Sequence, residues 1–122
     1  MTNPLIEDCP DAVRAYLILA EAEDRTAAVS LFVEDAHVTD DGHDYIGVTQ
    51  IRAWLGRVAS QYTYTTTPIS TNSDAATRTT SIRCRLEGTF PGGMVDLDYR
   101  FQLDDSGRLV CLTITPSADQ PA

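Results

Sequence analysis

The sequence lacks the features that mark membrane, secreted and nucleic-acid-binding proteins. No stretch approaches about 18 consecutive apolar residues. The first twenty residues, where a signal peptide would have an apolar block, contain the charged side chains of Glu7, Asp8, Asp11 and Arg14. Positive charge is scarce, because 9 Lys+Arg stand against 18 Asp+Glu and leave a net charge of −9. Such a protein repels phosphate backbones and anionic lipid. We therefore expect a cytoplasmic protein whose partners include neither nucleic acid nor membrane.

Metal-binding residues are also few. The three cysteines, Cys9, Cys84 and Cys111, are far apart with no C-x-x-C pair, and we interpret them as small buried hydrophobic residues. The two histidines, His37 and His43, lie six positions apart with no third ligand at suitable spacing. The sequence therefore predicts no metal site, and no cofactor is expected.

What is present is the composition of one globular domain. The chain has 122 residues, of which 43% are hydrophobic and 22% charged, enough apolar side chain for one core. We expect a single domain over residues 8–116, between an N-terminal tail of residues 1–7 and a disordered C-terminal tail of residues 117–122.

Helical periodicity is confined to the first half. Asp8 can cap a helix that starts near Cys9, and Val13, Tyr16 and Leu17 lie on its apolar stripe, which predicts a helix over residues 9–23. A second, shorter helix is predicted over residues 26–32. A third follows Gly47, over residues 48–58.

Strand alternation dominates the rest. Residues 36–40 and 45–47 predict a short hairpin around Asp41-Gly42, a dipeptide suited to positive φ. Four longer alternating runs follow, separated by turn residues, at 62–70, 77–89, 95–103 and 109–115. Neighbouring runs should pair in order as an antiparallel meander. Together these elements predict an α+β fold, in which a curved antiparallel sheet forms a cone and three N-terminal helices pack on its concave face.

Several segments resemble one known superfamily. They are Val13-Arg14-Ala15-Tyr16, Ala22-Glu23-Asp24 and the run from Val29 to Asp40, with further similarity at 46–52 and 106–110. The sequence resembles the nuclear transport factor 2-like (cystatin-like) superfamily, and within it the ketosteroid isomerase and SnoaL-like polyketide cyclase branch.

This resemblance implies a set of catalytic residues. Asp40 matches the aspartate that moves a proton on a carbon next to a carbonyl, and Tyr16 matches the tyrosine that donates a hydrogen bond to the enolate oxygen. Tyr99 stands where the isomerases have a protonated aspartic acid, and its hydroxyl is the second expected hydrogen-bond donor to the enolate oxygen. Asp98 is one residue away and, because strand side chains alternate, should face the opposite side unless a bulge intervenes.

The same residues also have plainer interpretations. Without the resemblance, Tyr16 is a core tyrosine and Asp40 a turn carboxylate. Asp96, Asp98 and Arg100 are typical of a solvated strand face or a subunit contact, with an Asp/Arg hydrolase site as the alternative. His37 should lie at the surface or an interface, and His43 in a loop. Residues expected to line a ligand pocket, although they are equally typical of plain core, are Trp54, Tyr62, Tyr64, Phe32, Leu55 and Phe101.

Two functions remain open at this stage. The first is a cofactor-independent isomerase or cyclase that acts on a small apolar carbonyl compound in a conical pocket. The second is a non-catalytic ligand-binding or scaffold protein of the same fold. The pKa of Asp40 distinguishes the two functions. Burial in an apolar cavity raises the pKa of a catalytic base, whereas a turn carboxylate in solvent keeps its ordinary pKa. We also expect a homodimer through the outer sheet face, where apolar and β-branched side chains should be exposed.

Overall fold

The fold contains two α-helices, one 3-10 helix and six strands within the part of the chain that the structure describes. The computed structural model describes residues 7, 9–19, 25–61 and 64–118. The helical elements are α2 (Asp11–Leu19), η1 (Arg25–Leu31) and α3 (Val48–Gln61). The strands are β1 (Phe32–Asp40), β2 (His43–Ile46), β3 (Tyr64–Asp74), β4 (Thr79–Gly88), β5 (Met94–Leu103) and β6 (Leu109–Pro116).

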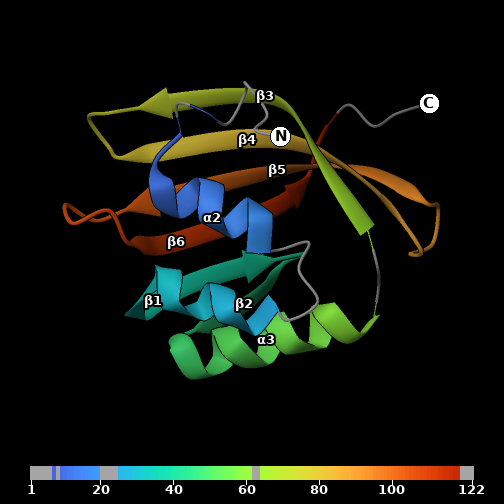
Figure 1. Cartoon of the computed structure of the whole chain (residues 1–122), viewed down its shortest axis with the longest axis horizontal. Coiled ribbons are helices and arrows are strands. Elements are labelled where there is room, and N and C mark those ends of the chain that lie inside the picture. The colour runs from blue at the N-terminus through green and yellow to red at the C-terminus, as the bar shows by residue number, and fades with distance from the viewer. Residues whose placement is uncertain (1–6, 8, 20–24, 62–63, 119–122) are drawn as a thin grey trace.

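All six strands form one curved sheet in the order β2-β1-β6-β5-β4-β3 (Figure 1). Strands β3 to β6 pair antiparallel in chain order, which confirms the predicted meander. The prediction of an entirely antiparallel sheet is wrong at one pair, because β1 lies parallel to β6. This pair brings the N-terminal hairpin beside the last strand, a contact that local sequence patterns do not encode.

Helices α2 and α3 cover one face of the sheet, which we call the inner face; the opposite side is the outer face. Figure 1 shows α2 over the β4–β6 region and α3 beside β1 and β2. Ring contacts of Tyr16 with Tyr99 and Phe101 join α2 to β5. Three α-helices were expected, but the second is the 3-10 helix η1. The predicted end of the first helix, at residue 23, lies outside the described residues.

Two strands are longer than the sequence predicts. Phe32, expected at the end of a helix, is the first residue of β1 and pairs with Leu109. Its apolar neighbours fit a buried helix and a buried strand equally well, so periodicity alone does not distinguish the two. Strand β3 continues to Asp74 through the polar residues 72–74, which were assigned to a turn; the turn lies at residues 75–78.

The β1–β2 turn forms as predicted and fixes the position of Asp40. Asp41 and Gly42 both have positive φ, 52° and 76°, which is the geometry of a tight two-residue hairpin turn. Asp40 pairs with His43 immediately before this turn. The last side chain of β1 is therefore held at the rim of the sheet.

The core lies between the inner face and the helices. On β4, Ile82, Cys84 and Leu86 are buried there, while Arg83 and Arg85 point outward. On the outer face Arg83 pairs with Asp98 and Arg85 with Asp96. This face therefore carries charged and hydroxyl side chains. The expectation of an apolar outer face is wrong, because the helices already cover the apolar side of each strand.

The end of the described chain is held against the sheet. Ser117, expected in a disordered tail, is buried, and its N–H donates to the carbonyl oxygen of Asp96 over 2.9 Å. Its hydroxyl donates to Oδ1 of Asp98 over 2.7 Å. The tail prediction is therefore wrong at this residue.

Candidate functional site

Asp40 and Tyr99 lie in one row across three neighbouring strands. Asp40 on β1 pairs with Ile114 on β6, and Ile114 pairs in turn with Tyr99 on β5. Directly paired residues present their side chains on the same face of a sheet. Two strand spacings separate the backbones of Asp40 and Tyr99 by roughly 10 Å. The carboxyl and phenol groups therefore approach the same space over Ile114.

The Asp40 carboxyl group is half-buried and held by helix α3. The indole Nε1–H of Trp54 donates a hydrogen bond to its Oδ2 over 3.0 Å. Burial raises the pKa of Asp40 above the ordinary 3.8, and Asp41 adds to this rise. The Trp54 hydrogen bond, His43 and Arg57 act in the opposite direction without cancelling it. Asp40 therefore differs from a solvated turn carboxylate.

Tyr99 is a buried phenol whose ring stacks on Phe101, with ring centroids 6.1 Å apart. Burial raises its pKa well above the ordinary 10.0, and interactions with Tyr16, Tyr64, Cys84 and Asp40 raise it further. The hydroxyl consequently keeps its proton at neutral pH. It is a hydrogen-bond donor rather than an anion.

Tyr16 connects helix α2 to the same region. Its ring is 6.4 Å from Tyr99, 5.5 Å from Phe101 and 6.3 Å from Phe32, between centroids. All four aromatic side chains are at most 5% exposed. The structure thus brings the two predicted oxyanion donors together. Phe32 and Phe101 form the apolar support around them.

The remaining pocket candidates separate into three cases. Trp54 was expected as an apolar wall, and its indole N–H turns out to bond Asp40 directly. Leu55, beside it on α3, is buried in the core, and Tyr64 at the start of β3 is partly buried. Tyr62 lies outside the described residues.

Sequence reasoning missed three residues around Asp40. His43 was assigned to a loop, but it lies on β2 directly opposite Asp40. Tyr45 and Arg57 were not singled out, yet Tyr45 stacks on Trp54 and Arg57 bonds Tyr45. Alternation along β2 from His43 would have placed Tyr45 on the same face as Asp40. Trp54 and Arg57 are at positions i and i+3 of the predicted helix, so their side chains lie on the same helix face. This spacing was a second signal in the sequence that Arg57 lies near Trp54.

Two alternative bases point away from this site. His37 lies on the outer side of β1, where its Nε2 is 3.0 Å from Oδ1 of Asp44. Asp98 is paired with Arg83 and Ser117, and the β4–β5 and β5–β6 registers have no bulge at its position. Both predicted orientations are confirmed.

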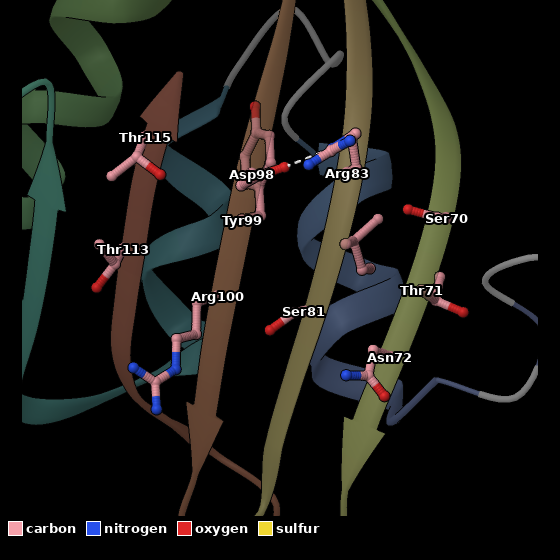
Figure 2. A pocket seen from close by; sticks show the side chains of 11 residues that line it. Ser70, Thr71, Asn72, Ser81, Arg83, Asp98, Tyr99, Arg100, Thr113 and Thr115 are labelled. Carbon is pink, nitrogen blue, oxygen red and sulfur yellow. Dashed lines mark hydrogen bonds and ion pairs between the residues drawn. The ribbon is translucent and has the colours of Figure 1, made fainter. Parts of the chain in front are cut away.

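A polar hollow of about 370 Å³ lies on the outer face (Figure 2). Figure 2 shows the Arg83–Asp98 ion pair bridging β4 and β5, with Thr113 and Thr115 on β6 and Arg100 further along β5. The carboxylates of Asp96 and Asp98 have lowered pKa values because their arginine partners donate hydrogen bonds to them. The two carboxyl groups are therefore ionised, and the arginines beside them compensate their negative charge. Such ion pairs are typical of a solvated surface or a subunit contact.

Residues 7, 9–19, 25–61 and 64–118 contain neither a metal-binding cluster nor a helix that could span a membrane. No group of three or more His, Cys, Asp or Glu side chains in these ranges is arranged to hold a metal ion. Within the same ranges, no helix is long and apolar enough to cross a membrane.

Solved structures with the same fold are numerous. A Sinorhizobium meliloti protein, provisionally named a polyketide cyclase, is 31% identical, with a TM-score of 0.80 over 88% of this chain and 96% of that chain. SalBIII, an epoxide hydrolase/cyclase-like enzyme in pyran ring formation of salinomycin, is 16% identical, with a TM-score of 0.76 over 88% of this chain and 89% of that chain. Rv0760c from Mycobacterium tuberculosis, in complex with estradiol-17β-hemisuccinate, is 17% identical, with a TM-score of 0.73 over 88% and 92%.

No protein-family model matches the sequence, and no curated protein matches it. The family is shown instead by the Sinorhizobium meliloti structure, which exceeds 30% identity over nearly its whole length. The row of Asp40 and Tyr99, with Tyr16 facing it from α2, lies in a fold shared with cyclase-like and ketosteroid isomerase-like proteins. The chain therefore belongs to the nuclear transport factor 2-like superfamily, in its SnoaL-like branch.

Proposed function

We propose that the chain is a cofactor-independent isomerase or cyclase that moves a proton on a carbon next to a carbonyl group. Asp40 is the base, and the hydroxyls of Tyr16 and Tyr99 stabilise the enolate oxygen. The substrate is a small apolar carbonyl compound, bound in a conical pocket between α2, α3 and the inner face of the sheet. Trp54, Leu55, Phe32 and Phe101 are its proposed apolar wall, and Tyr62 is a further proposed ligand-binding residue.

The proposed reaction conserves all atoms and electrons. The Asp40 carboxylate takes the proton from the carbon, and the C–H electron pair moves into the carbonyl to form an enolate. The O–H groups of Tyr16 and Tyr99 donate hydrogen bonds to the resulting negative oxygen. Protonated Asp40 then returns the proton to a different carbon. The sequence contains no lysine, so no side-chain amine of this chain can convert the carbonyl into a Schiff base.

One observation carries the proposal: the shared row of Asp40 and Tyr99 across Ile114. A base and an oxyanion donor act together only when one small molecule reaches both. The protonation states agree with these roles, because burial raises the pKa of both groups. A raised carboxyl pKa makes Asp40 a stronger base, and a raised phenol pKa keeps Tyr99 a donor.

A non-catalytic ligand-binding protein is the second candidate. The packing of Tyr16, Phe32, Tyr99 and Phe101 against one another favours it, because these rings occupy interior space that a substrate would need. Rv0760c holds a steroid ester in the same fold, and another neighbour is a designed 17-OHP binder. Such a protein would bind a small apolar molecule without any turnover that depends on Asp40.

The test uses 3-cyclohexen-1-one as a minimal probe. Its conversion to 2-cyclohexen-1-one requires removal of one proton next to the carbonyl and its return two carbons away, and conjugation makes the product visible in the ultraviolet. The wild-type chain should accelerate this conversion. Asp40→Asn should lower turnover by roughly 10²–10⁴-fold, which is the usual contribution of a positioned general base.

Asp44→Asn is the matched control. Asp44 lies on the same hairpin, but its carboxylate bonds His37 and Thr39 on the outer side. Its replacement should leave turnover within about twofold of wild type. Saturable binding of the ketone with no Asp40-dependent conversion would contradict the enzyme and support the binding protein.

We further propose a homodimer in which the outer faces of two copies pack together. This face carries charges of both signs, with Arg83, Arg85 and Arg100 beside Asp96 and Asp98. In a two-fold interface the same patch of both copies meets, so an arginine such as Arg100 of one copy can pair with an acidic side chain of the other. Sedimentation at micromolar concentration should give twice 13.3 kDa, and Arg100→Glu should shift the population towards monomer. A wild-type mass of 13.3 kDa contradicts the dimer.

A further inference from the structure

We propose that Tyr45 and Arg57 are positioning residues for Asp40 and that they act on it through Trp54. This inference rests on the proposed role of Asp40 as the base. It adds two side chains that do not approach the row of Asp40 and Tyr99 themselves. Together the four side chains form a chain of contacts from the exposed side of α3 to the carboxyl group.

The first contact fixes one oxygen of the base. The Trp54 Nε1–H bonds Oδ2 of Asp40 over 3.0 Å, so this oxygen has a partner and Oδ1 is left for another proton. An aspartate side chain has two rotatable bonds, and a single hydrogen bond holds it only if the donor is itself held. The orientation of the indole therefore determines the orientation of the carboxyl group.

The second contact fixes the indole. The rings of Trp54 and Tyr45 are stacked, with centroids 5.8 Å apart and planes 29° from parallel. Tyr45 pairs with Val38 on β1, two residues before Asp40. The ring that supports Trp54 is thus attached to the same hairpin as the carboxyl group that Trp54 holds. Movement of α3 relative to this hairpin would disturb the stack and the hydrogen bond together.

The third contact fixes the tyrosine and adds a charge. Arg57 lies one turn after Trp54 on α3, and its Nη2 donates to the Tyr45 hydroxyl oxygen over 2.8 Å. Its guanidinium carbon is also 5.4 Å from the centroid of the Tyr45 ring, within cation–π range. The arginine is exposed, yet these two contacts hold its positive charge towards Asp40.

This charge acts on the base together with three neighbouring groups, Asp41, His43 and Trp54. Burial and Asp41 raise the pKa of Asp40, whereas Trp54, His43 and Arg57 lower it. Tyr99, across Ile114, is affected by the charge of Asp40 in turn. Trp54 and Arg57 therefore lower the Asp40 pKa against the effect of burial, and the contacts of Tyr45 with both hold them in place.

The test measures Asp40 directly, without a substrate. The aspartate carboxyl carbons are labelled by growth on ¹³C-aspartate. The NMR signal of Asp40 is the one that is missing from Asp40→Asn, and its chemical shift is followed as a function of pH. Trp54→Phe should raise the pKa of Asp40, and Arg57→Met and Tyr45→Phe should raise it less. Arg57→Lys retains the charge and should restore most of the wild-type value. Tyr45→Phe should add nothing in the Arg57→Met background, because the hydroxyl acts through the arginine.

Arg52→Met is the matched control. Arg52 is also an exposed arginine of α3, but the side chains that stack on Tyr45 and donate to its hydroxyl are Trp54 and Arg57. This variant should leave the pKa of Asp40 unchanged. In the 3-cyclohexen-1-one assay, Trp54→Phe and Arg57→Met should lower kcat by up to about 10²-fold with little change in KM, and the kinetic pKa should shift as in the titration.

Two results overturn the inference. One is an Asp40 pKa that is the same in Arg57→Met, Tyr45→Phe and Arg52→Met. The other is a fall in kcat without any change in the pH profile, which a loss of packing alone would produce. If the titration shifts as expected but Asp40→Asn keeps full turnover, the positioning stands and the proposed function fails.

Discussion

Asp40 and Tyr99 flank Ile114 in one row of the sheet, and the carboxylate of the first helps to keep the second protonated. The main cause of the raised Tyr99 pKa is burial, and the negative charge of Asp40 adds to it. The ionised carboxylate of Asp40 therefore favours the protonated, neutral form of the Tyr99 hydroxyl beside it.

This coupling predicts a change at Tyr99 when Asp40 is neutralised. Asp40→Asn removes a negative charge from the row, so the Tyr99 hydroxyl should ionise at lower pH than in wild type. Ultraviolet titration of tyrosinate measures the pKa of Tyr99, and the Tyr99→Phe variant assigns the signal. An unchanged or higher Tyr99 pKa in Asp40→Asn would show that the two groups do not share one space.

The two tyrosines should contribute to turnover rather than to substrate affinity. Tyr16→Phe and Tyr99→Phe each remove one donor to the enolate oxygen, which costs about 2.7–4 kcal/mol where no other donor replaces it. Turnover of 3-cyclohexen-1-one should fall by about 10²–10³-fold, and KM should stay nearly constant. A rise in KM with unchanged kcat would assign these hydroxyls to uniform binding instead.

The raised pKa of Asp40 should appear in the stability of the protein. The folded chain keeps the Asp40 proton to higher pH than the unfolded chain, so this residue stabilises the fold least above its raised pKa. Asp40→Asn should therefore be more stable than wild type at pH 7, and the difference should shrink as the pH falls towards 3.8. Urea unfolding at a series of pH values measures the difference.

Asp98 provides a control of opposite sign for that experiment. The hydrogen bond from Arg83 lowers its pKa in the folded state, so its contribution to stability is lost as the pH falls. Asp98→Asn should consequently be less stable than wild type at pH 7. Two variants that shifted stability in the same direction would contradict the assigned environments.

The aromatic side chains that pack around Tyr16 and Tyr99 should contribute to the free energy of unfolding as other core residues do. Phe101 is fully buried and contacts Tyr16 and Tyr99, so Phe101→Ala should cost about 3–5 kcal/mol in urea unfolding. Ile46, an apolar side chain that is 58% exposed on β2, is the control, and Ile46→Ala should cost less than about 0.5 kcal/mol. Equal costs would mean that Phe101 does not support the core.

Local patterns in the sequence located much of this arrangement. Alternation placed Asp98 and Tyr99 on opposite faces of β5, and Asp41-Gly42 located the turn that follows Asp40. The resemblance to the isomerases named Asp40 and Tyr16 as a catalytic pair, and this pairing stays a prediction. These features depend on neighbouring residues or on a long matching segment, so they are available without coordinates.

The remaining features depend on contacts between distant residues. The parallel pairing of β1 with β6 aligns Asp40 with Tyr99, and nothing within either strand encodes it. The hydrogen bond from Trp54 to Asp40 required the placement of α3 against β1, so sequence periodicity showed only an aromatic residue on an apolar stripe. Strand β3 continues through hydroxyl-rich residues because its partner β4 satisfies their backbone groups.

The pH dependence of turnover, measured together with the NMR titration of Asp40, tests the central claim most directly. If Asp40 is the base, kcat/KM for 3-cyclohexen-1-one rises with pH through a single ionisation. Its midpoint equals the titration midpoint of the Asp40 carboxyl group, above the ordinary 3.8. A rate that does not change across that titration, or that follows the ionisation of another group, would contradict the assignment of Asp40 as the base.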